Sequence, residues 1–283
     1  MRRRALCLLA LIATPLSAAE HLGSHTWRPD WHGAGGYSAL WLDDEGLGFV
    51  ALSDRGRYVR GTLDRGEDGA VTRVEVAEQG PLQRHGGGAL PPGRTDAEGL
   101  ARSGDSFVVA YEGVHRLMRH PDLSGPAMSI GRPEAFQRFE GNAGFEALAA
   151  DADGMLYAIP EQSSRPDLPF PVWVHHPTKG WRVLFQLRRD GRYLATGADI
   201  GPDGRLYLLE RDFAIIGFRT RIRSFDLTGG DERLELQTRL GRHDNLEGIS
   251  VWRDAVGRRR VTMISDDNFR SIQRTEFVDY VLD

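Results

Sequence analysis

The sequence predicts an all-β protein built from about five repeats of roughly fifty residues each. Three observations predict it. Short apolar segments separated by Gly, Pro and Asp-Gly run along the 283-residue chain, and no long segment keeps a helical periodicity. These segments come in pairs joined by turn-like sequence. The second segment of each pair ends in an acidic residue.

Each pair has the pattern of a β-hairpin. The first segments are 38–42, 98–101, 146–149, 198–201 and 247–250, and the second segments are 47–52, 107–111, 155–159, 205–209 and 261–264. Turn-forming sequences such as Asp153-Gly154 and Asp203-Gly204 join two of these pairs, as tight hairpins require. The acids that end the second segments are Asp54, Glu112, Glu161, Glu210 and Asp266, at spacings of 58, 49, 49 and 56 residues.

Repeats of this length, with about four short strands each, predict a β-propeller. The first repeat shows the four strands of a blade at 37–42, 47–53, 57–63 and 71–77. Little sequence follows Glu247, so we expect an N-terminal strand near Thr26 to Trp31 to complete the last blade. Six blades are the alternative if the segment from Gly80 to Thr95 contains an irregular hairpin.

The first nineteen residues have the features of a secretory signal peptide. Three arginines at 2–4 precede an apolar stretch at 5–14, which is too short to span a bilayer. Small residues at 17–19 form a cleavage site typical of such peptides. We therefore expect residues 20–283 to fold as one domain, either secreted or in the periplasm.

The composition excludes several functional classes. Cys7 is the one cysteine and lies in the signal peptide, so the mature chain has no thiol for disulfides, catalysis or metal binding. Loss of the three leading arginines takes the formal net charge from −4 to −7, and no nucleic-acid partner is expected of so acidic a chain. No later apolar run is long enough to span a membrane.

The acids are predicted to gather at one end of the propeller channel. In an antiparallel pair, the start of the first strand and the end of the second lie at the same edge, so these residues share one mouth. The predicted metal ligands are Glu98, Glu146, Glu247, Asp54, Glu112, Glu161, Asp266 and Asp267, with further oxygens from Asn142, Asn245 and Asn268. Calcium (Ca2+) is the expected cofactor, because it accepts many oxygen ligands in flexible geometry. The alternative is that these acids cap turns or pair with arginines.

Four residues are candidates for a catalytic role. Arg55 and Arg211 follow strand-end acids, and guanidinium groups beside a metal are suited to holding a phosphate. Glu210 ends the second segment of its repeat, and His243 lies just before the acidic segment at Glu247 and would carry protons. The alternative is that the arginines pair with acids and hold neighbouring blades together.

Several segments resemble a known family. They are Ser53-Asp54-Arg55-Gly56, 96–101 (DAEGLA), 142–149 (NAGFEALA), 208–211 (LLER), 245–248 (NLEG) and 264–269 (ISDDNF). Together they resemble the phytase-like domain described as "esterase-like activity of phytase", in order and over nearly the whole mature chain. The resemblance implies a secreted bacterial propeller with repeated acidic residues that hydrolyses phosphate esters.

We therefore expect a secreted, calcium-dependent hydrolase that acts as a monomer on a small phosphate ester, either a phosphomonoester or a phosphodiester. Two alternatives remain open. Calcium in a propeller channel can also polarise a carbonyl group, as a lactonase or carboxylesterase would require. The protein is otherwise a non-catalytic binding module in which calcium only stabilises the fold.

Overall fold

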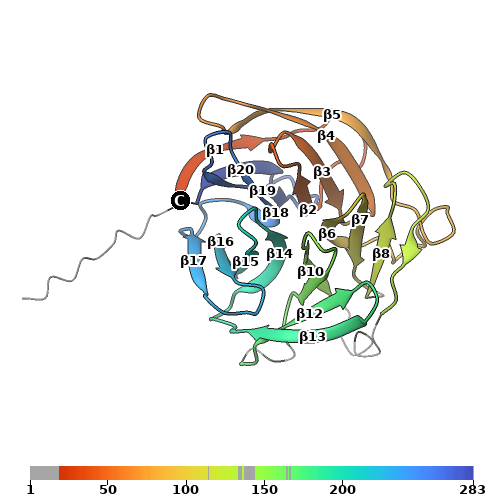
Figure 1. Cartoon of the computed structure of the whole chain (residues 1–283). Helices are drawn as coiled ribbons and strands as arrows, with labels where there is room; N and C mark the ends of the chain where they lie inside the picture. Colours follow the sequence, from red (N-terminus) through yellow and green to blue (C-terminus); the bar gives the residue numbers. More distant parts are fainter. Residues whose placement is uncertain are drawn as a thin grey trace, which may run out of the picture.

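The structure is a computed structural model that describes residues 19–113, 115–132, 136, 144–163, 165 and 167–282. These residues form five four-stranded antiparallel sheets arranged in a ring (Figure 1). The predicted five-bladed β-propeller is confirmed, and the described residues contain no sixth sheet. Most of the predicted signal peptide, 1–18, lies outside them. Within the described ranges, no helix is long and apolar enough to cross a membrane.

Four blades are formed by consecutive strands, with the first strand of each blade innermost. Blade 1 comprises β2 Tyr37–Leu42, β3 Gly48–Ser53, β4 Arg57–Arg65 and β5 Val71–Pro81; blade 2 comprises β6 Ala97–Ser103, β7 Ser106–Tyr111, β8 Arg116–His120 and β9 Met128–Ser129. Blade 3 comprises β10 Phe145–Ala150, β11 Leu156–Pro160, β12 Phe170–His176 and β13 Gly180–Leu187; blade 4 comprises β14 Leu194–Ile200, β15 Leu206–Ala214, β16 Gly217–Phe225 and β17 Arg233–Gln237.

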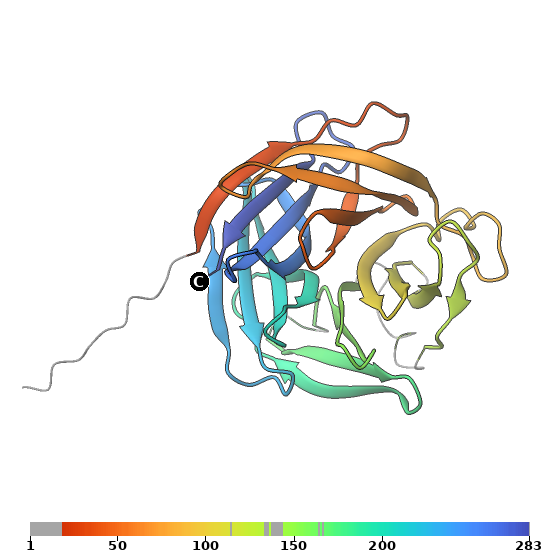
Figure 2. The same cartoon turned by 45° about the horizontal axis from the view of Figure 1, so that its top comes forward.

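Blade 5 joins the two ends of the chain. Its strands, from the inside outward, are β18 Asn245–Arg253, β19 Arg259–Asp266, β20 Glu276–Val281 and β1 Glu20–Thr26. The predicted closure by an N-terminal strand is confirmed, but that strand ends at Thr26, where we expected it to begin. The Trp27 ring then stacks on Tyr37 of blade 1, with ring centroids 5.1 Å apart. Figure 2 shows β1 beside the long outer strands β4 and β5.

The hydrophobic core is divided among the spaces between blades. Five buried clusters are present, and each joins side chains of two neighbouring sheets. One example contains Leu52 from blade 1 and Val109 from blade 2, both fully buried. Because each blade is packed on both faces, the inner strands are held firmly around the channel.

The inner strands share one irregularity that positions the site. Each of β2, β6, β10, β14 and β18 has a β-bulge opposite the second strand of its blade. A small residue follows the bulge in every blade, because neighbouring inner strands approach closely there. A Cβ on Gly197 would lie 2.3 Å from the carbonyl oxygen of Glu247, and one on Gly248 would lie 2.7 Å from the amide nitrogen of Leu40. Larger residues would therefore push the inner strands apart.

Candidate functional site

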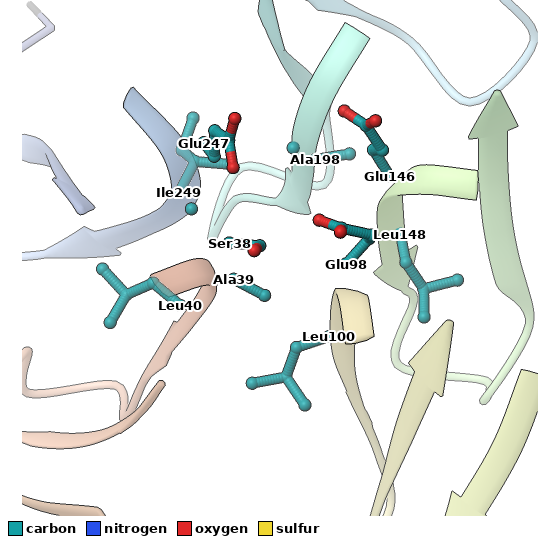
Figure 3. A pocket seen from close by; sticks show the side chains of 12 residues that line it. Ser38, Ala39, Leu40, Glu98, Leu100, Glu146, Leu148, Ala198, Glu247 and Ile249 are labelled. Carbon is teal, nitrogen blue, oxygen red and sulfur yellow. The ribbon is translucent and has the colours of Figure 1, made fainter. Parts of the chain in front are cut away.

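The extra residues of the five bulges form a ring inside the channel, which we call the bulge ring. Its members are Ser38, Glu98, Glu146, Thr196 and Glu247. A bulge re-aims a side chain relative to the rest of its strand. Figure 3 shows Glu98, Glu146 and Glu247 around one small pocket with Ser38 beside them. Thus the three glutamates that recur in the sequence lie together in space.

The space between these three carboxylates is small. Its volume is about 10 Å³, which is room for about one water molecule or one ion. Apolar side chains, including Leu40, Leu100 and Leu148, line the pocket below the acids. The carboxylates therefore lie near one another in surroundings that solvate charge poorly.

A second layer lies at the mouth. In each blade the residue before the bulge pairs with a residue of the second strand, and the next residue after that partner belongs to this layer. Its members are Asp54, Glu112, Glu161, Arg211 and Asp266. In blade 4 this position belongs to Arg211, because Glu210 pairs with Ala195 as Ser53 pairs with Tyr37. Successive strand residues face opposite ways, so this one-residue difference directs Glu210 to the other face of its blade.

Glu210 is therefore separated from the other predicted site residues. It is fully buried, and its carboxylate accepts hydrogen bonds from Arg221 and Arg223 at 2.6–3.0 Å. These arginines also pair with Asp190 and Glu232. This network holds blade 4 together, so we do not retain Glu210 as a catalytic candidate.

Arg211 links three blades at the mouth. Its guanidinium donates to Glu161 at 3.2 Å, to Asn245 at 2.6 Å and to Glu247 at very short range. Burial lowers the pKa of Arg211, but the surrounding carboxylates raise it further, so it stays charged. Arg211 therefore pairs with acids of two neighbouring blades, which is the alternative role that the sequence allowed for the arginines.

A group of three acids extends the bulge ring toward blade 2. Ligand atoms of Asp96, Glu98 and Glu112 all lie within 4.8 Å of one another, and Gly144 donates its amide to Glu112 at 2.9 Å. Asp96 was missed as a site residue by the sequence reasoning. The sequence did contain a signal for it. Asp96 lies two residues before Glu98, as the candidate ligand Asn245 lies two residues before Glu247.

The acids raise one another's pKa values. Burial, and then Glu146 and Glu247, hold the pKa of Glu98 well above its usual range. Burial, and then Glu161 and Glu247, do the same for the pKa of Glu146, although Arg211 opposes them. Burial raises the pKa of Glu247 to about 8 although Arg211 opposes it. Burial with neighbouring acids likewise raises the pKa values of Asp54 and Glu112 to about 7 and of Asp266 to about 6. Burial disfavours ionised carboxylates, and adjacent carboxylates disfavour them further.

Asp267 and Arg55 lie at the rim of the mouth. The Asp267 carboxylate accepts hydrogen bonds from the amides of Gly36 and Phe269 and from the Thr275 hydroxyl, so it organises the loop after β19. Arg55 is exposed, and its guanidinium carbon lies 3.3 Å from the centroid of the Phe269 ring. Phe269 keeps a φ of 51°, a strained value for a residue with a side chain.

His243 has different surroundings from those expected. The His243 ring bonds the Tyr280 hydroxyl at 2.7 Å and lies 3.9 Å from Glu276. Burial and the nearby His21 lower the pKa of His243 to about 4. It contacts blade 5 and not the carboxylates of the mouth, so we do not retain it as a proton carrier. Asn268 lies in the loop that Asp267 organises, and Asn142 lies outside the described residues.

The fold and the site define this protein as a five-bladed β-propeller with a carboxylate-lined channel. The chain belongs to the Phytase-like family, described as "Esterase-like activity of phytase", whose model matches residues 32–269. The expected family membership is thus confirmed. A comparison with curated proteins gives no match.

Solved propellers resemble the chain in fold. An α-L-arabinofuranosidase catalytic domain from Coprinopsis cinerea is 12% identical, with a TM-score of 0.55 over 93% of this chain and 96% of that chain. The α-L-arabinofuranosidase of Podospora anserina is 11% identical, with a TM-score of 0.54 over 93% of this chain and 97% of that chain. The endo-arabinase of Bacteroides thetaiotaomicron is 10% identical, with a TM-score of 0.52 over 88% and 94%. At these identities the likeness concerns the fold alone.

Proposed function

We propose that this protein is a secreted, calcium-dependent hydrolase of phosphate esters. The main support is the convergence of Glu98, Glu146 and Glu247, from three inner strands, on one small cavity. Like charges at such range need a cation or protons to offset them. The description of the Phytase-like family supports an esterase reaction.

The donor set fits calcium. Carboxylate oxygens are the ligands that calcium prefers, at about 2.4 Å from the ion. Oxygens of Asp96, Glu98 and Glu112 lie within 4.8 Å of one another, a span that one ion can bridge. When bound, calcium would supply positive charge that polarises a phosphoryl group and makes a bound water more acidic.

The two arginines at the mouth supply the remaining positive charge. Arg211 is fixed by Glu161, Asn245 and Glu247, and Arg55 is exposed on the Phe269 ring. Fixed guanidinium groups would orient the phosphoryl oxygens and stabilise charge that develops on them during hydrolysis. Arg55 is exposed at the rim of the mouth, so we assign it the first contact with the substrate.

The test is hydrolysis of phytate, a generic phosphomonoester, a phosphodiester and a lactone. The protein is first stripped with a chelator and is then assayed again with calcium restored. We expect phosphate-ester turnover only with calcium, and a loss of about a hundredfold or more in Glu146→Gln. The matched control is Glu45→Gln, an exposed acid in the turn at the opposite end of blade 1, which keeps full activity.

Each other outcome contradicts a specific part of the proposal. Turnover of the lactone alone would make the protein a lactonase. Calcium-dependent stabilisation without turnover would make it a binding propeller. Full activity of Glu146→Gln would remove that residue from the site.

A further inference from the structure

The hairpin of β15 and β16 projects from the ring on the side of the mouth carboxylates. Strand pairing continues beyond Arg211 to the pair Ala214↔Gly217, which leaves 215–216 as the turn. At about 3.4 Å per residue, the turn reaches up to ~13 Å past Arg211. In blade 1 the corresponding connection consists only of residues 54–56. Blade 4 therefore carries an arm that the ring itself does not require.

The end of this arm is apolar and exposed; we call Phe213, Ile215 and Ile216 the apolar tip. Ile215 is 97% exposed, Ile216 82% and Phe213 55%. Two-residue hairpin turns favour Asn, Asp and Gly, and water disfavours large aliphatic side chains. Two adjacent isoleucines at this turn therefore do not serve the fold, and they indicate a partner outside the chain.

Arginines flank the apolar tip on both sides. Exposed Arg192 donates to the carbonyl oxygen of Phe213 at 3.5 Å. On the other side, Gly241 donates its amide to the carbonyl oxygen of Phe218 at 2.8 Å, which places the turn with exposed Arg239 and Arg242 against the hairpin. One acid, Asp212, lies among these arginines, 3.9 Å from Arg192 and 3.8 Å from Arg219. The four arginines outnumber it, and this local positive charge contrasts with the net charge of −4 of the whole chain.

A second apolar point lies on the same side. Ile272, in the connection between β19 and β20, is 88% exposed. The adjacent Gln273 donates to Asp244 at 3.1 Å, so this connection lies next to the segment that follows Arg242. The exposed apolar residues and arginines thus form one surface beside the mouth.

We propose that this surface docks on a phospholipid membrane that contains anionic lipids, with the apolar tip in the lipid layer. Aliphatic and aromatic side chains enter the boundary between headgroups and acyl chains, and neighbouring arginines bind lipid phosphates. The apolar tip matches the acyl chains in polarity, and the arginines beside it match the negative charge of the lipid phosphates. The docking requires neither a metal nor turnover, so it is independent of the proposed hydrolase activity.

The test is sedimentation of the purified protein with vesicles of phosphatidylcholine, with and without phosphatidylglycerol. We expect the protein to sediment with the anionic vesicles. The double variant Ile215→Asp/Ile216→Asp should lower the bound-to-free ratio about tenfold or more. Arg192→Ser/Arg239→Ser, which leaves Arg242 in place, should weaken the preference for anionic lipid. The matched control is Val256→Asp, because Val256 is 75% exposed in a turn on the opposite side of the ring.

The controls distinguish other partners of the surface. Sedimentation velocity without lipid would detect a second copy of the chain bound at the apolar tip. A dimer that the isoleucine double variant disrupts, with no vesicle binding, would overturn the membrane proposal. Equal vesicle binding by the wild type and the double variant would also overturn it. Circular dichroism of each variant verifies that its propeller is folded.

Discussion

The clearest consequence of the carboxylate cluster is an inverted dependence of stability on pH. Burial raises the pKa of Glu247 from 4.5 to about 8 in the folded protein. Between these values the unfolded chain has released a proton that the folded protein still holds. Raising the pH therefore destabilises the metal-free fold, and the loss is complete only above about pH 8. One pKa unit corresponds to about 1.4 kcal/mol, so Glu247 alone accounts for about 3 kcal/mol between pH 5 and pH 8.

Chelator-treated protein should therefore unfold at lower urea concentration at pH 8 than at pH 5. Glu247→Gln removes the ionisable group. Between pH 5 and pH 8, the free energy of unfolding of this variant should therefore fall by about 3 kcal/mol less than that of the wild type. Calcium should flatten the wild-type dependence, because the ion replaces the protons. The control is Glu67→Gln, an exposed acid between β4 and β5. Identical pH dependences of the wild type and Glu247→Gln would refute the reasoning.

Three further substitutions test how the ring is held together. Glu210→Gln leaves buried arginines of β16 without their carboxylate, so the free energy of unfolding should fall by about 3 kcal/mol or more, while calcium binding is retained. Gly248→Ala brings a Cβ within 2.7 Å of the β2 backbone and should cost about 2 kcal/mol through displacement of an inner strand. Trp27→Ala removes an aromatic side chain packed between blades 5 and 1 and should cost about 3 kcal/mol.

Urea denaturation measures all three substitutions, and calorimetric titration measures calcium binding by Glu210→Gln. Gly125→Ala is the control for Gly248→Ala, because a Cβ at Gly125 would make only ordinary contacts of 3.6 Å and longer. A wild-type stability for Gly248→Ala would show that the inner strands are less crowded than described. Loss of calcium binding in Glu210→Gln would show that Glu210 contributes to the metal site after all. A free energy of unfolding of Trp27→Ala equal to that of the wild type would show that Trp27 does not help to close the ring.

Close packing of the inner strands explains why the site recurs with the repeats. Each bulge is followed by Gly or Ala, because the next inner strand leaves no room for a larger side chain. In four blades the bulge side chain lines the channel pocket, whereas in blade 4 the Thr196 hydroxyl donates to the carbonyl oxygen of Leu246 at 3.4 Å. In three blades that side chain is Glu, and these three glutamates are the residues that the repeated Glu-(Gly/Ala)-(Leu/Ile) pattern singled out.

The sequence by itself determined the architecture and the inner acids. Alternation of short apolar segments with turns indicates hairpins, and a fixed repeat places equivalent residues at equivalent positions around a ring. Glu98, Glu146 and Glu247 could therefore be grouped without a structure. The closing strand was also predictable, although its bounds differed by several residues because strand ends depend on pairing with β20.

Only the tertiary structure decided which of two adjacent residues faces the channel. Glu210 and Arg211 are neighbours in sequence, but strand geometry directs one to a buried arginine network and the other to the mouth. The repeat length varies by several residues, so counting along the chain could not settle a difference of one. The structure also places Asp96 beside Glu98 and Glu112, and it places His243 against Tyr280 of blade 5 instead of at the mouth. Proximity between strands depends on register and packing, which sequence spacing alone does not specify.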